Sequence, residues 1–254
     1  MLLCVALLAM TPLAAQAEPV AVHHIEGTLR GFLALRSADG KLLAVGDLIQ
    51  TVRGNRVTDR LTFHFADGSL DDETTVFSQS GTFRLITDRH IQKGSFFPHP
   101  MDMLIDARSG QVTVRTTGKD GKEEVKTAHL NLPPDLVNGM LSPVVRNLAP
   151  QKTQAQVSMV VATPKPRIVR LYISARGEDP LTLLGTERKA LHYDIRIDLG
   201  GIAGVVASLV GKQPPDIQLW IIGGDAPTFI RSQGILFVDG PMLTIEQTVP
   251  MWPR

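Results

Sequence analysis

Residues 42–78 read LLAVGDLIQTVRGNRVTDRLTFHFADGSLDDETTVFS, and polar and apolar side chains alternate along much of this stretch. Turn-forming pairs interrupt the alternation here and on either side, at Asp39-Gly40, Gly54-Asn55, Asp67-Gly68 and Ser80-Gly81. Alternation indicates strands with one buried face, and such pairs are typical of tight hairpins because they tolerate a positive φ. The stretch from Ile25 to Lys93 therefore predicts a meander of five antiparallel strands.

The rest of the chain extends this pattern. Further strands are expected near 101–107, 111–117, 123–129, 154–163, 167–176 and 187–199, followed by three closing strands. The apolar segments 134–148 and 201–210 predict two helices, and a helix that is apolar all round must be buried. We therefore expect a mainly β protein, a single curved antiparallel sheet forming a half-barrel or open barrel, with one or two apolar helices against its concave face.

The N-terminal segment and the composition define the cellular context. Residues 1–17, MLLCVALLAMTPLAAQA, are uncharged, apolar and end in the small-x-small pattern of a signal peptide. We expect cleavage after Ala17, a single domain over 18–254 and a periplasmic or secreted protein. The single cysteine, Cys4, is lost with this segment, which excludes thiolate chemistry, and no cofactor is expected. A net charge of +1 provides no general field for nucleic acid, which is not an expected partner.

The hairpin spacing assigns side chains to the two faces of the meander. If each turn has two residues, the packed face carries Leu29, Leu33, Leu35, Leu48, Val52, Val57, Leu61, Phe63, Phe65, Leu70, Val76, Phe83, Leu85 and Ile91. On the same face Asp72 lies opposite Arg89, either as a structural ion pair or as a polar anchor within an apolar groove. The expected ligand contacts are Leu61, Phe63, Val76, Leu85, Asp72 and Arg89.

The opposite face carries the sharpest chemical pattern in the sequence. The same spacing places His64, Asp71 and His90 in one row across neighbouring strands, with Glu73 and Asp88 in the next row. Two imidazoles flanking a carboxylate could bind a divalent metal or relay protons. A solvent-exposed face of charged pairs would give the same pattern, and a displacement of one residue in the register would dissolve the row.

Three stretches resemble uncharacterised exported bacterial proteins: DGSLDDETTVFSQ at 67–79, FFPHPMDMLIDARSGQVTVR at 96–115 and LVGKQPPD at 209–216. The order of elements over residues 24–249 also resembles the half-barrel of the LolA and LolB lipoprotein carriers. That resemblance implies an acyl chain held between sheet and helices. It rests on architecture without a diagnostic motif, so it transfers no binding residue.

Three functions remain open from the sequence. The leading one is a non-enzymatic envelope protein that binds a lipid or another apolar small molecule in a cleft between sheet and helix. The second is an enzyme, metal-dependent or acid/base, that uses His64, Asp71 and His90. The third is an envelope scaffold that uses sheet edges or the loop at Phe96 and Phe97, a loop that either folds over the sheet or contacts a membrane surface or ligand.

Overall fold

The computed structural model of the protein describes residues 18–249, except 119–120, 149–153, 163–164, 184–185 and 200–212. Two expectations, the signal peptide at 1–17 and the helix at 201–210, lie outside the described residues. No helix within the described part of the chain is both long enough and apolar enough to cross a membrane.

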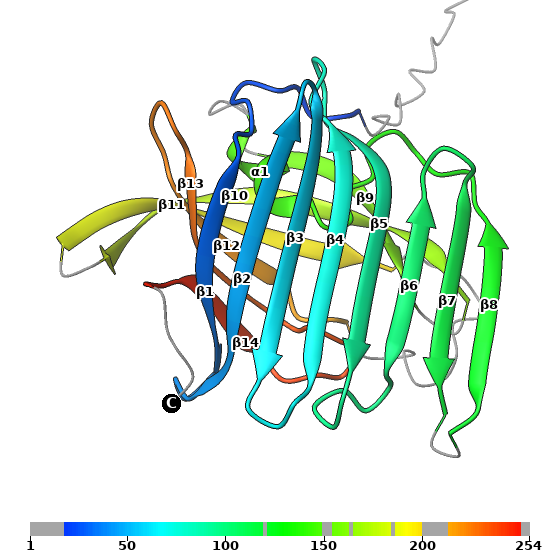
Figure 1. The fold of residues 1–254 in the computed structure, drawn as a ribbon. Coiled ribbons are helices and arrows are strands. Elements are labelled where there is room, and N and C mark those ends of the chain that lie inside the picture. The colour runs from blue at the N-terminus through cyan, green and yellow to red at the C-terminus, as the bar shows by residue number, and fades with distance from the viewer. Residues whose placement is uncertain are drawn as a thin grey trace, which may run out of the picture.

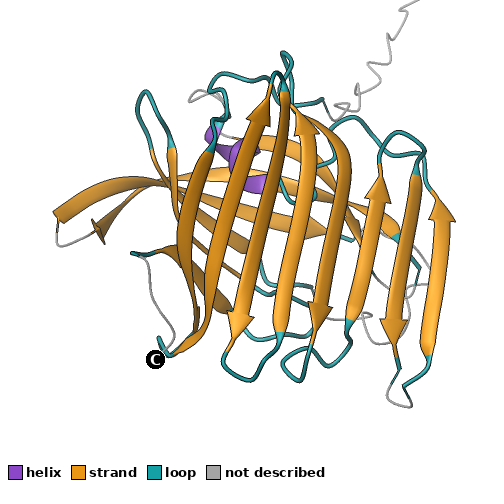
Figure 2. Cartoon of the chain, viewed as in Figure 1, coloured by secondary structure: helices purple, strands orange, loops and turns teal. Residues whose placement is uncertain are grey.

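In the described part of the chain, fourteen strands form one antiparallel sheet in the order β8-β7-β6-β5-β4-β3-β2-β1-β14-β13-β12-β11-β10-β9. The strands are β1 Leu29–Ser37, β2 Leu42–Arg53, β3 Arg56–Phe65, β4 Leu70–Ser78, β5 Arg84–Lys93, β6 Met101–Asp106, β7 Gln111–Thr117, β8 Glu123–His129, β9 Gln154–Val161, β10 Arg167–Leu183, β11 Thr186–Asp198, β12 Ile217–Ile222, β13 Thr228–Gly234 and β14 Leu243–Gln247. Among these described strands, β8 and β9 are the two edges, so the sheet that they form is not closed into a barrel. The expected mainly β, curved antiparallel sheet is confirmed (Figures 1 and 2).

The sheet bends into two layers. Strands β1 to β8 form the front layer in Figure 1, and β9 to β12 pass behind it at a steep angle. The main hydrophobic core lies between the layers and joins front-layer side chains such as Phe77 and Ile105 to back-layer side chains such as Leu171 and Ile195. The interior between these layers is therefore where side chains from distant parts of the sequence meet.

The mid-chain helix is shorter than expected. Of the expected segment 134–148, only Leu141–Arg146 forms a helix, α1, and its residues Pro143, Val144 and Val145 are buried. The preceding segment instead lies along the edge of β9, where the Asn138 side chain both accepts from the backbone N–H and donates to the carbonyl of Val160. Gly139 follows this segment with φ +64°, a left-handed conformation that interrupts a helix, so the helix starts only after it.

The register of the second hairpin agrees with the expectation, that of the first agrees from Leu29 to Leu35 but changes at a β-bulge before its turn, and that of the third does not agree. Strands β2 and β3 join through a two-residue turn, with Arg53 opposite Arg56. Between β3 and β4 the Phe65 N–H donates to the Ser69 carbonyl over 3.0 Å, so the loop has three residues and ends at Gly68 with φ +83°. Because the register is displaced by one residue, each side chain of β4 lies on the opposite face of the sheet from the one expected.

The next hairpin preserves this reversal. Strands β4 and β5 join through a longer loop, and a β-bulge follows Val76, so Asp71 lies opposite Gln92 and Glu73 opposite His90. The inward side chains of β4 and β5 are consequently Asp71, Glu73, Thr75, Phe77, Leu85, Asp88, His90 and Gln92. The expected positions of Leu70, Val76 and Ile91 on the packed face are wrong, because these side chains alternate with the inward ones and lie on the outer face.

The loop after β5 folds over one end of the sheet. Phe97 is 2% exposed, and its ring lies 5.5 Å from that of Phe65 and 5.7 Å from that of Phe237, both near edge-to-face. Phe96 packs on the same aromatic group. The loop at Phe96 and Phe97 therefore folds over the sheet and covers part of the core.

Candidate functional site

The structure separates the six expected ligand contacts. Leu61, Phe63 and Leu85 face the core, whereas Val76 lies on the outer face of β4. The expected pairing of Asp72 with Arg89 is wrong because the displaced register places both on the outer face with other partners. Asp72 pairs with Arg60 at 2.8 Å, and Arg89 pairs with Asp102 at 2.8 Å on β6.

The predicted row of His64, Asp71 and His90 is also divided. His64 is exposed on the outer face of β3, opposite Leu70, whereas Asp71 and His90 point inward. The one-residue displacement at the Asp67-Gly68 turn is the physical cause. Among the described residues, no three histidine, cysteine, aspartate or glutamate side chains are arranged to hold a metal ion.

Four of the predicted polar residues do meet, but inside the molecule. Nε2 of His90 lies 3.0 Å from Oδ1 of Asp71, whose Oδ2 accepts a 2.8 Å hydrogen bond from the Gln92 amide. Asp88 is fully buried, and its Oδ1 accepts a 2.7 Å hydrogen bond from the Thr75 hydroxyl. Oδ2 of Asp88 has no hydrogen-bond partner in the described structure. We call Asp71, Glu73, Asp88 and His90 the inner acid cluster.

Burial and mutual repulsion set the protonation of the inner acid cluster. Burial, followed by the charge of Glu73, raises the pKa of Asp88 to about 8, and burial likewise raises the pKa of Glu73. Burial alone would lower the pKa of His90, but the charges of Asp71 and Glu73 and the hydrogen bond to Asp71 outweigh it and raise that pKa to about 10. At neutral pH the cluster therefore holds a charged His90, within hydrogen-bond distance of Asp71, beside a protonated Asp88.

A second buried polar group attaches α1 to the front layer. Arg146 at the end of α1 donates to Glu26 over 2.8 Å, and Glu26 also accepts a 3.1 Å hydrogen bond from Gln50. Burial and the charge of Glu26 raise the pKa of nearby Asp59 to about 7, although Arg146 opposes this. The Glu26–Arg146 pair thus fixes the helix between the layers.

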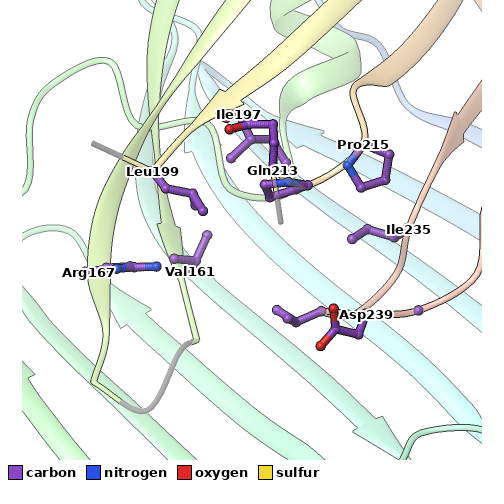
Figure 3. A pocket seen from close by; sticks show the side chains of 11 residues that line it. Val161, Arg167, Ile197, Leu199, Gln213, Pro215, Ile235 and Asp239 are labelled. Carbon is purple, nitrogen blue, oxygen red and sulfur yellow. Dashed lines mark hydrogen bonds between the residues drawn. The ribbon is translucent and has the colours of Figure 1, made fainter. Parts of the chain in front are cut away.

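A cavity of about 260 Å³ (Figure 3) is lined by no residue of either polar group. Its walls come from the ends of β9, β10 and β11, from the segment before β12 and from the connection between β13 and β14. The lining residues are Val161, Arg167, Ile197, Leu199, Gln213, Pro214, Pro215, Ile235, Val238, Asp239 and Gly240. The cavity is mainly apolar, with three polar side chains at its margins.

Arg167 is the distinctive residue of this cavity. It is the first residue of β10 and shares an inward face with Val169, Leu171 and Ile173, which belong to the core. Its Nε and Nη2 atoms are buried and have no hydrogen-bond partner in the described structure. Asp239, which has φ 60°, lies on the opposite wall in Figure 3, and the Gln213 amide donates to the Ile197 carbonyl.

Reasoning from the sequence placed no site here, although one signal was available. An arginine in phase with three apolar residues of a strand is an unusual inward position. Leu199, at the end of the strand expected near 187–199, also lines the cavity. The remaining walls come from segments that no hairpin spacing connects to β10.

The comparisons with known proteins show no family for this chain. No family model matches the chain, and no curated protein matches it. A crystal structure from Brucella abortus, a β-barrel-like protein of a domain of unknown function (DUF1849), is similar with a TM-score of 0.47 and 8% identity, over 89% of this chain and 98% of that chain. The resemblance to LolA and LolB is not confirmed.

Proposed function

We propose that this protein binds a small apolar molecule in the cavity beside Arg167, without catalysing a reaction. The observation that carries the proposal is an apolar cavity continuous with the core, because Val161, Ile197 and Leu199 all belong to or pack against the core cluster. Ligand sites in proteins are typically concave and mainly apolar, with a few polar groups that orient the ligand. A volume of about 260 Å³ suits a small ligand or one end of a longer one.

The inner acid cluster supports a structural role rather than catalysis. None of its residues lines the cavity, and Asp71 is hydrogen-bonded through both carboxylate oxygens. An acid/base enzyme would need its histidine within reach of a bound substrate. We therefore assign ligand binding to the cavity and internal stabilisation to the cluster.

The proposal includes export, which rests on residues 1–17. The test is to express the full chain in a bacterial host, fractionate the cells and determine the N-terminal sequence of the product. A product outside the cytoplasm that begins at Glu18 supports export. A cytoplasmic product that retains residues 1–17 contradicts it.

Binding is tested with aminoanthracene, a small apolar fluorophore whose emission rises in apolar surroundings. The test variant is Val238→Trp, which enlarges a side chain of the cavity wall that is 48% exposed. The matched control is Val125→Trp on edge strand β8, where the same residue type is 54% exposed and lies away from the cavity.

We expect the wild type and the Val125→Trp variant to bind the fluorophore alike, and the Val238→Trp variant to bind at least about tenfold more weakly. Tenfold corresponds to about 1.4 kcal/mol, which is the scale of losing one or two buried methylene contacts. Equal binding by the two variants would place the fluorophore elsewhere. Absence of binding to the wild type would contradict the proposed function itself.

A further inference from the structure

We propose that the ligand of this cavity is a small aliphatic monocarboxylic acid whose carboxylate binds Nε and Nη2 of Arg167. The inference rests on the proposed function and specifies the chemical class of the ligand. It is carried by two buried, unpartnered donors on a side chain that lines a mainly apolar cavity.

The geometry of the guanidinium group supports a carboxylate. Nε and Nη2 present parallel N–H bonds along one edge of the planar group, which matches the two oxygens of a carboxylate. Two other arginines of this protein use the same edge in this way. Nε and Nη2 of Arg60 donate to the two oxygens of Asp72 at 2.8 and 3.2 Å, and those of Arg89 donate to Asp102 at 3.0 and 2.8 Å.

The energetics point in the same direction. A buried donor without a partner bears the full desolvation penalty, and the penalty is larger for a charged group. Nε and Nη2 of Arg167 are both buried, so the described structure has two such donors on one side chain. A ligand carboxylate would satisfy both donors and neutralise the charge in one step.

The other cavity residues limit the charge and shape of the ligand. Asp239 on the facing wall disfavours a second negative charge, which selects a monoanionic carboxylate over a dianionic phosphate monoester. The walls formed by Val161, Ile197, Leu199 and Ile235 are aliphatic and offer no hydrogen-bond partner to a polar body. The part of the ligand that contacts these walls is therefore apolar.

The experiment compares octanoate, octanol and octyl phosphate, which share one apolar chain, by isothermal titration calorimetry on the mature protein. Octanoate is expected to bind the wild type about 10–100-fold more tightly than octanol, as expected for hydrogen bonds to a charged group. Octyl phosphate should bind more weakly than octanoate.

Two variants test the role of Arg167, with a third as control. Arg167→Leu should remove the preference for octanoate while octanol binding is retained, and Arg167→Lys should restore only part of it. Arg170→Leu, at an exposed position three residues further along β10, should behave as the wild type. Circular dichroism of each variant verifies that the sheet is intact.

The outcomes separate the inference from the proposed function. If octanol and octanoate bind the wild type equally, or if Arg167→Leu retains the preference, the carboxylate assignment is overturned while apolar binding stands. Tighter binding of octyl phosphate also overturns it. If none of the three ligands nor aminoanthracene binds, the proposed function fails, and the inference fails with it.

Discussion

The protonation of Asp88 makes the stability of the protein depend on pH in an unusual direction. Burial first, and then the charge of Glu73, raise the pKa of Asp88 from 3.8 to about 8 in the folded protein. Between these two values the folded state binds a proton that the unfolded state has released. The free energy of unfolding therefore falls as pH rises across this window.

The size of the effect follows from the same linkage. One proton of difference changes the free energy of unfolding by about 1.4 kcal/mol per pH unit, so Asp88 accounts for a loss of roughly 2.7 kcal/mol between about pH 5 and pH 7. His90 adds to the loss above its ordinary value of 6.5, because its folded pKa is also raised, to about 10. Asp59, with a pKa of about 7, adds to the loss at lower pH.

The perturbation is Asp88→Asn, which replaces the acid by a neutral group of the same shape. The free energy of unfolding is measured by urea denaturation, followed by far-ultraviolet circular dichroism, across about pH 5 to pH 9. At acidic pH the variant should lie close to the wild type, since Asp88 is protonated there. At alkaline pH the variant should be the more stable protein, by several kcal/mol at most, because no charge is forced into the core.

The matched control is Asp72→Asn on the neighbouring strand. Burial opposes ionisation of Asp72, but hydrogen bonds from Arg60 and Thr62 outweigh it and hold the pKa of its carboxyl below 3.8. Asp72→Asn should therefore lower stability by a similar amount at every pH in this range. Parallel pH profiles for wild type and Asp88→Asn would refute the assignment of a buried, protonated Asp88.

Two further predictions concern the segment around α1, and thermal unfolding tests both. Gly139→Ala should lower the free energy of unfolding by more than about 2 kcal/mol, because Gly139 has φ +64° and an added Cβ would lie 1.7 Å from Oγ1 of Thr75; a loss below 0.5 kcal/mol, the usual size for a surface change, would contradict this packing. Arg146→Met should cost about 3–5 kcal/mol by leaving Glu26 buried without its ion-pair partner, and the double variant with Glu26→Gln should recover much of the loss. An additive double variant would show that the two side chains are not coupled.

The sequence predicted the fold class because alternation and turn residues are local signals. It failed at β4 for a physical reason: glycine after Asp67 suits a two-residue turn and also the last position of a three-residue loop. Hydrophobicity could not decide between the two registers. Acidic residues occupy both faces from Asp71 to Glu73, and the apolar pair Val76 and Phe77 gives each face one large side chain.

The candidate site was less predictable than the fold. The sequence did place the four residues of the inner acid cluster on one face, because Asp71 and Glu73 alternate along one strand and Asp88 and His90 along the next. It assigned that face to solvent, together with His64. The cavity depends on packing between the back layer and the connection from β13 to β14. The spacing of residues along the sequence predicts contacts between neighbouring strands, but it does not predict contacts between such distant segments.

The pairing of β1 with β14 has a consequence for the order of assembly. Each half of the sheet extends outward from this seam through neighbouring hairpins, but the seam itself joins residues as distant as Arg36 and Glu246, whose side chains meet at 2.7 Å. Formation of such a long-range pair is slow compared with hairpin closure. Until β14 pairs with it, β1 is therefore an open edge of the sheet, and charged side chains such as Arg30 and Arg36 disfavour the pairing of such an edge with other chains.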